Sequence, residues 1–211
     1  MRRAATLLIL PLLLASGQVL RAQSPHLGFS VNLTIPTGDF ASKTYLTTTG
    51  HEKETYDLGL GGSFTASFPV DRNLAFRLDL SGSSETGVNR AAGYSDLNLR
   101  HSLFSVGGDL QIFPQGTAFR HRGLYFVAGL SADFEQFSRG YGNDYYYYNN
   151  SSSTSKSRLG GKVGIGHSFG FDAGRKFTVE ATYHTTLTSK DVNAGDPPST
   201  DFLKLGFGLV F

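Results

Sequence analysis

Seven charged residues stand at alternate positions in stretches that are otherwise apolar or small. They are Arg77, Asp79, Asp109, Asp133, Lys162, Glu180 and Lys204. Charges that share one enclosed face can form buried ion pairs, or they can line a path for ions. Isolated charges in a narrow space are costly, so we expect Arg77 to pair with Asp79 or Asp109. By the same argument, we expect Lys204 to pair with Glu180.

The histidines are the next candidates for chemistry. His184 shares a face with Thr182 and Glu180 in an alternating stretch, which would suit a nucleophile, a base and an orienting acid. No family motif accompanies these residues. His167 and Ser168 are adjacent, so a strand places them on opposite faces and they cannot act together. We therefore predict no catalytic residue.

Other motifs of catalysis and metal binding are absent from the sequence. There is no Cys, no HExxH pattern, no acidic calcium loop and no glycine-rich phosphate loop. We therefore predict neither a metal site nor a cofactor. His26, His101 and His121 are interpreted as residues of turns or of a strand bulge.

The composition limits the class of protein. Only 17% of the 211 residues are charged, against roughly 25% in an ordinary soluble domain, and 26 are glycine. The lack of cysteine excludes a disulfide scaffold and a thiol nucleophile. No stretch after residue 22 is apolar for long enough to form a membrane-spanning helix.

Residues 1–22 are predicted to be a cleaved secretory signal peptide. Arg2 and Arg3 form a basic start, and residues 7–14 are an apolar run interrupted by one proline. Cleavage after Ala22 fits best, and Gly17 is the rival position.

Residues 23–211 would then form one mature domain. Removing the three arginines of the signal leaves 16 basic and 17 acidic side chains. This charge balance argues against nucleic acid as a partner.

The mature chain is dominated by apolar residues at every second position. Such alternation indicates strands with one apolar face and one small or polar face. Eight stretches show it: 27–34, 58–68, 74–80, 104–112, 124–134, 159–169, 177–183 and 203–211. The alternation changes phase between Leu97 and Leu103, so we expect a β-bulge near His101.

The predicted connections alternate between short and long. Short ones cover residues 69–73, 114–123 and 172–176, and long ones cover 35–55, 82–96, 136–157 and 187–200. This pattern predicts an all-β, eight-stranded antiparallel up-and-down barrel. Short turns on one side and long loops on the other are typical of barrels that cross the bacterial outer membrane.

A soluble barrel with its apolar face inward remains the alternative, because alternation alone fits both. The polar face carries few charges, whereas a water-facing exterior usually carries many. Several phenylalanines also fall near the short-turn ends, as an interfacial aromatic girdle requires. They are Phe68, Phe76, Phe113, Phe126, Phe169, Phe177 and Phe211.

The segment 203–211 places apolar residues at every second position and stops on an aromatic one. Phe207, Leu209 and Phe211 resemble the signal that the β-barrel assembly machinery reads. With the signal peptide and the alternating strands, the chain resembles the small outer-membrane β-barrel family, a porin-like group that includes the barrel of outer membrane protein A. The resemblance implies a place in the bacterial outer membrane, surrounding lipid, and periplasmic chaperones and the assembly machinery as transient partners.

The resemblance leaves the activity open, because one barrel fold hosts many functions. A closed structural barrel that presents its long loops is our first hypothesis. A small channel for ions or very small solutes is the alternative, and a lipid-modifying enzyme of the outer leaflet is the third. Among the loops, Tyr145, Tyr146, Tyr147 and Tyr148 lie among Asn, Ser and Gly, a mixture suited to binding an unidentified surface ligand.

Overall fold

The computed structural model describes residues 24–47, 50–91, 97–141, 152–170, 174–187 and 200–211. The predicted signal peptide lies outside these ranges. The elements are β1 (His26–Pro36), α2 (Gly38–Ala41), β2 (Ser42–Thr47), β3 (Gly50–Tyr56), β4 (Gly59–Pro69), β5 (Leu74–Ala91), β6 (Leu97–Ile112), the 3-10 turn η1 (Ala118–Arg120), β7 (Gly123–Tyr141), β8 (Ser152–Gly170), β9 (Lys176–Thr186) and β10 (Phe202–Val210). Neither described helical segment is long and apolar enough to cross a membrane.

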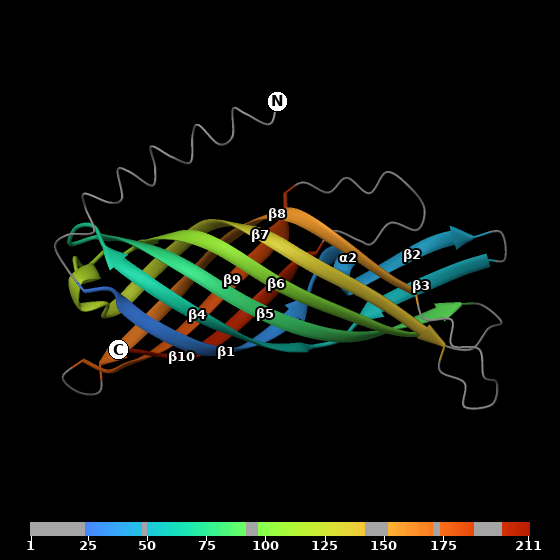
Figure 1. Ribbon diagram of the computed structural model, residues 1–211, viewed down its shortest axis with the longest axis horizontal. Helices are drawn as coiled ribbons and strands as arrows, with labels where there is room; N and C mark the ends of the chain where they lie inside the picture. The colour runs from blue at the N-terminus through green and yellow to red at the C-terminus, as the bar shows by residue number, and fades with distance from the viewer. Residues whose placement is uncertain (1–23, 48–49, 92–96, 142–151, 171–173, 188–199) are drawn as a thin grey trace, which may run out of the picture.

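Eight strands close into a barrel, as the sequence predicts (Figure 1). Each pairs antiparallel with its neighbour in the order β1, β4, β5, β6, β7, β8, β9 and β10, and β10 pairs with β1. The seam continues past the strand ends, since the backbone N–H of Phe211 donates to the carbonyl of Leu27 at 2.8 Å. A closed barrel has no unpaired edge and can therefore satisfy its backbone within a membrane.

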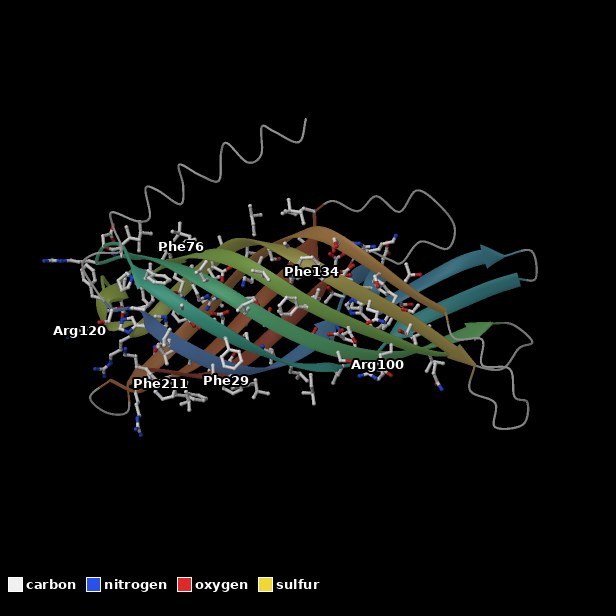
Figure 2. The ribbon with its side chains drawn as sticks, in the orientation of Figure 1. Phe29, Phe76, Arg100, Arg120, Phe134 and Phe211 are labelled. Carbon is white, nitrogen blue, oxygen red and sulfur yellow. The ribbon has the colours of Figure 1, made fainter. Side chains whose placement is uncertain are left out.

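The apolar residues of the barrel wall point outward. Leu60 is 67% exposed and Phe64 is 65% exposed, whereas Ser63 between them is 5% exposed. The same contrast recurs around the barrel, and the labelled phenylalanines lie along its wall in Figure 2. The soluble-barrel alternative is therefore wrong, because its apolar face would have filled the interior.

Several strands are longer than the sequence suggested. β5, β6, β7 and β8 have 18, 16, 19 and 19 residues, so much of the predicted connection 82–96 is strand. The predicted connection 35–55 also contains α2 and the β2–β3 hairpin, which pairs with the far end of β5. Small polar residues obscured these extensions, because they fit a loop and a water-facing strand equally well.

The expected bulge near His101 is absent. β6 pairs with β5 and with β7 residue by residue, with Glu85 opposite His101 and Leu103 opposite Glu135. The apolar phase changes because Leu99 and Leu103 turn inward, where both are buried.

An apolar cluster that we call the outer cap lies at the long-loop end. It comprises Phe40, Tyr56, Leu99 and Phe137. Phe40 belongs to α2 and is fully buried, stacked on Tyr56 with ring centroids 4.7 Å apart. The connection between β1 and β2 therefore folds into the barrel mouth.

A second apolar cluster, the inner cap, lies at the short-turn end. It comprises Ala75, Phe113, Ala118, Tyr125 and Val127. Phe113 is fully buried, so its assignment to the lipid-facing girdle is wrong. It follows β6 into the connection that carries η1, and this connection folds under the barrel. Of the other predicted girdle residues, Phe76, Phe126, Phe169 and Phe211 are exposed.

Candidate functional site

The lumen between the two caps collects the predicted charged residues. Arg77, Asp79, Asp109, Asp133 and Lys162 are buried, and Glu180 and Lys204 line a pocket inside the barrel. Their strand neighbours with exposed apolar side chains lie on the opposite face of the wall, as period-two geometry requires.

Arg77 on β5 lies at the centre of this set. Its guanidinium donates to Asp109 on the adjacent β6 at 2.8 Å. It also holds both carboxylate oxygens of Glu180, at 2.6 and 3.0 Å. Because Glu180 belongs to β9, which does not pair with β5, this two-point contact crosses the lumen. Such bidentate pairs are the strongest and most directional ion pairs in proteins.

Lys162 on β8 makes a second connection across the barrel. Its ammonium lies 2.6 Å from Asp79 and 2.9 Å from Asp109. We call Arg77, Asp79, Asp109, Lys162 and Glu180 the lumen network. Its ion pairs join four strands, β5, β6, β8 and β9, so it fixes the barrel cross-section. Two cations in the network face three carboxylates.

Lys204 does not pair as expected. Glu180 pairs with Arg77 instead, and Lys204 has no ion pair within 4 Å in the described part of the chain. Of the two partners expected for Arg77, Asp109 is the one in contact. Alternation identifies the inward face but does not tell which side chain is long enough to reach across it.

Inward glycines make room for the charged and aromatic side chains. A Cβ atom on Gly129 would collide with Asp109, and one on Gly160 would collide with Asp133. Likewise, Gly166 leaves space for the ring of Tyr125, whose hydroxyl donates to Glu180 at 3.0 Å. That bond links the inner cap to the lumen network.

Asp133 forms a separate group further toward the long loops. It accepts a hydrogen bond from Ser105 at 2.5 Å and lies 2.9 Å from Nε2 of His184. The partner of His184 is thus Asp133. The imidazole ring of His184 stacks on the ring of Phe202, with centroids 4.7 Å apart. A catalytic histidine lies between hydroxyl and acid, whereas here the acid lies between Ser105 and His184. The arrangement is that of a structural hydrogen-bonded pair.

Two further buried pairs escaped the sequence analysis. Glu85 accepts from Thr34 at 2.7 Å and lies 2.7 Å from Nδ1 of His101. Arg158 lies 3.1 Å from Glu135. His101 is therefore an inward strand residue and not part of a bulge. Extending the alternation past the apolar stretches would have placed Glu85, Glu135 and Arg158 on the inward face.

Little free space remains inside the barrel. One pocket beside Ser105 and His184 offers about 20 Å³ to the centres of water molecules, and a second beside Arg77 and Tyr125 offers about 30 Å³. A single water needs about 10–15 Å³ by this measure, so each pocket has room for about one to three waters. Lys204 lines both pockets.

His121 lies in the connection between β6 and β7 and is buried against the inner cap. Its ring contacts Phe113 and Tyr125, with centroids 5.4 and 5.6 Å apart. Burial lowers the pKa of His121 to about 3, and the positive charges of His26 and Arg77 act in the same direction. His121 is therefore a turn residue, as expected, and it packs as a neutral side chain against the inner cap.

The other predicted residues lie outside the lumen. Phe207, Leu209 and Phe211 are exposed on the outward face of β10 or just after it. Tyr145, Tyr146, Tyr147 and Tyr148 lie outside the described residues. Within the described ranges, no three His, Asp or Glu side chains come together to hold a metal ion.

Comparisons with known proteins agree with this architecture. The family described as outer membrane protein beta-barrel domain matches residues 7–211. Outer membrane protein OprG from Pseudomonas aeruginosa is similar in structure, with a TM-score of 0.52 and 13% identity over 90% of this chain and 97% of that chain. A major outer membrane protein from Thermus thermophilus has a TM-score of 0.50 and 13% identity over 88% of this chain and 99% of that chain.

The attachment invasion locus protein Ail of Yersinia pestis has a TM-score of 0.48 and 14% identity over 90% of this chain and 100% of that chain. No curated protein matches the sequence. At these identities, the structural similarity describes the fold alone.

Proposed function

Because the chain belongs to the outer membrane protein beta-barrel domain family, we propose that it is a closed barrel that presents its outer segments at the cell surface. In this proposal, the barrel is a rigid support and does not conduct solutes. The observation that carries it is the lumen network, in which Arg77 and Lys162 reach carboxylates on other strands across the interior. An eight-stranded barrel is just wide enough for side chains to fill, and these fill it.

The two caps support the same proposal. The outer cap and the inner cap bury aromatic rings at opposite ends of the lumen network. An ion would have to pass both apolar clusters and displace the buried pairs between them, which is unfavourable in a low dielectric. The water-sized pockets are too small to form a continuous aqueous path by themselves.

The test is conductance of the folded mature chain in a planar bilayer. We expect no steady openings from the wild type once a shift in the mobility of the unboiled protein on a gel has verified folding. The double variant Phe40→Ala with Arg77→Ser, which opens one cap and the network, should conduct. Arg100→Gln, an exposed change at the long-loop end, should remain silent. Reproducible wild-type openings would contradict the closed barrel.

The small channel remains the second candidate because of Lys204. This side chain lacks an ion pair within the described residues and touches both pockets, so it could guide an anion between them. Under that proposal, wild-type openings would be selective for anions, and Lys204→Glu would reverse the selectivity. The same bilayer recordings therefore separate the two functions.

We propose no enzymatic activity, since His184 is held by Asp133 and Phe202 instead of a nucleophile. The third hypothesis, an outer-leaflet lipid-modifying enzyme, predicts a change in lipid mass when the protein is overproduced. We expect the lipid masses to stay unchanged, and also expect no binding of nucleic acid.

Export and assembly form part of the proposal. Residues 1–22 would be removed after export, and periplasmic chaperones and the β-barrel assembly machinery would handle the chain transiently. The exposed row of Phe207, Leu209 and Phe211 on β10 is the proposed recognition signal. Replacing Phe211 with Ser should lower the amount of folded protein in the outer membrane while leaving export unchanged.

Tyr145–Tyr148 are the proposed contact region for a surface ligand.

A further inference from the structure

Four arginines lie in the connections at the short-turn end, and we call them the arginine collar. Arg72 lies between β4 and β5, Arg120 and Arg122 lie between β6 and β7, and Arg175 lies between β8 and β9. All four side chains are exposed. None forms an ion pair with any residue in the described ranges. Figure 2 shows Arg120 at this end of the barrel and Arg100 toward the opposite end.

Nearby acidic residues do not neutralise the collar. The three short connections contain two acids, Asp71 and Asp172. A carboxylate oxygen of Asp71 accepts from the backbone N–H groups of Asn73 at 2.6 Å and Leu74 at 2.8 Å. Asp71 therefore closes its own turn, and Asp172 lies outside the described residues. The collar keeps an excess of positive charge.

Each short connection places an arginine at the same sequence separation from the lipid-facing wall. Arg72, Arg122 and Arg175 stand two residues before Leu74, Leu124 and Phe177, where the apolar face of β5, β7 and β9 begins. Two residues of chain span at most about 7 Å. This spacing puts the guanidinium groups at the level where lipid headgroups border the acyl chains.

Exposed apolar side chains in the same connections fit this level. Val70 is 45% exposed beside the turn of Arg72, and Phe119 is 39% exposed next to Arg120. Apolar and aromatic side chains beside arginines are typical of residues at a membrane interface. Alternating charge and apolar surface suits a phosphate group attached to a hydrocarbon chain better than a soluble anion.

The long and the short connections differ in charge in the sequence. The connections 37–58, 92–96, 142–151 and 187–201 contain nine acidic and three basic residues. The short connections 70–73, 113–122 and 171–175 contain the four arginines and two acids. The short connections therefore carry a net positive charge, which attracts an anionic surface.

We propose that the arginine collar binds the phosphate groups of anionic phospholipids in the membrane leaflet that surrounds the short turns. The collar recruits these lipids around the barrel and sets the depth at which the wall lies in the membrane. Arginine suits this role because its planar group contacts two phosphate oxygens at once.

The test measures which lipid surrounds the folded mature protein in vesicles. Spin-labelled phosphatidylglycerol and spin-labelled phosphatidylethanolamine are compared in vesicles that contain both unlabelled lipids. We expect the motionally restricted shell to favour phosphatidylglycerol by about fivefold, the size expected for one arginine–anionic lipid contact. High salt should remove this preference, because the interaction is electrostatic.

Variants assign the preference to the collar. The triple variant Arg72→Gln, Arg122→Gln and Arg175→Gln should lose it, whereas Arg100→Gln should retain it. Gel mobility of the unboiled proteins verifies that all of them fold. Equal amounts of both lipids around the wild type would overturn the proposal, as would an equal loss in Arg100→Gln. If detergent-solubilised protein bound inorganic phosphate as well as it binds the lipid, a soluble anion would replace the lipid as the ligand.

Discussion

Arg77 and Leu78 are neighbours on β5 but face two different solvents. Arg77 is 6% exposed and contacts two carboxylates in the lumen, whereas Leu78 is 50% exposed on the outer wall. The lumen face therefore depends on particular partners at particular distances. The outer face depends only on being apolar, because lipid adapts to any side-chain shape. The comparison teaches that the identity of each residue matters on the lumen face, whereas on the outer face only its apolar character matters.

The largest expected effect comes from removing Arg77. Arg77→Ala leaves Glu180 buried without its cation and Asp109 with Lys162 alone, which typically costs about 3–5 kcal/mol. Leu78→Ala, one residue away, should cost less than about 1.5 kcal/mol. Urea titrations followed by gel mobility would measure the free energy of unfolding for both. Equal losses of unfolding free energy would mean that the lumen face and the outer face depend equally on the identity of their residues.

A charge on the outer face should cost nearly as much. Val106 is 43% exposed on the wall, next to the inward Ser105. Val106→Arg should destabilise the folded protein in vesicles by about 2–4 kcal/mol, as expected near the middle of a bilayer. Val106→Leu is the matched control and should be nearly neutral. The same urea titration in vesicles decides the result, and a tolerated arginine would place this wall in water.

A small volume change inside the wall should have an intermediate effect. Gly160→Ala forces a methyl group against Asp133 and His184, so we expect a loss of about 1–3 kcal/mol. Gly82→Ala is the outward counterpart, because its new methyl would meet only ordinary contacts. Its unfolding free energy should stay near that of the wild type. A reversed order of the two variants would refute the tight packing at Gly160.

The smallest effect concerns pH at the inner cap. The pKa of His121 falls from an ordinary value near 6.5 to about 3 in the folded protein. The unfolded chain therefore binds the proton more readily, and stability is lost as the pH falls below 6.5. Between pH 7.5 and pH 5.5 this loss amounts to about 1.4 kcal/mol. His121→Phe should show a smaller decrease over this interval in parallel urea titrations, and an unchanged pH dependence would remove His121 as the cause.

The barrel itself follows from the sequence alone. Period-two alternation identifies all eight barrel strands, and the charged residues on their polar face lie in the lumen. The ends of the strands were harder to predict from the sequence, because the far halves of β5 and β8 contain Ser, Thr and Gly, which also suit loops.

The partners inside the lumen could not be predicted in full. The sequence indicates that Arg77 faces inward, but the contact with Glu180 depends on how the strands are staggered around the barrel. The assignment of Phe113 to the girdle and the expected bulge near His101 failed for a related reason. Alternation assumes that an apolar residue seeks lipid, whereas both caps offer it a second apolar environment.

The β2–β3 hairpin has a mechanical consequence. β3 continues the sheet from the far end of β5, pairing Glu52–Tyr56 with Gly87–Ala91. A force applied to the hairpin is therefore loaded directly onto the backbone of the strand that also carries Arg77 and Asp79. The ion pairs from these residues to β6, β8 and β9 distribute that load around the barrel. The barrel is thus a stiff anchor for any molecule that exerts a force on the β2–β3 hairpin.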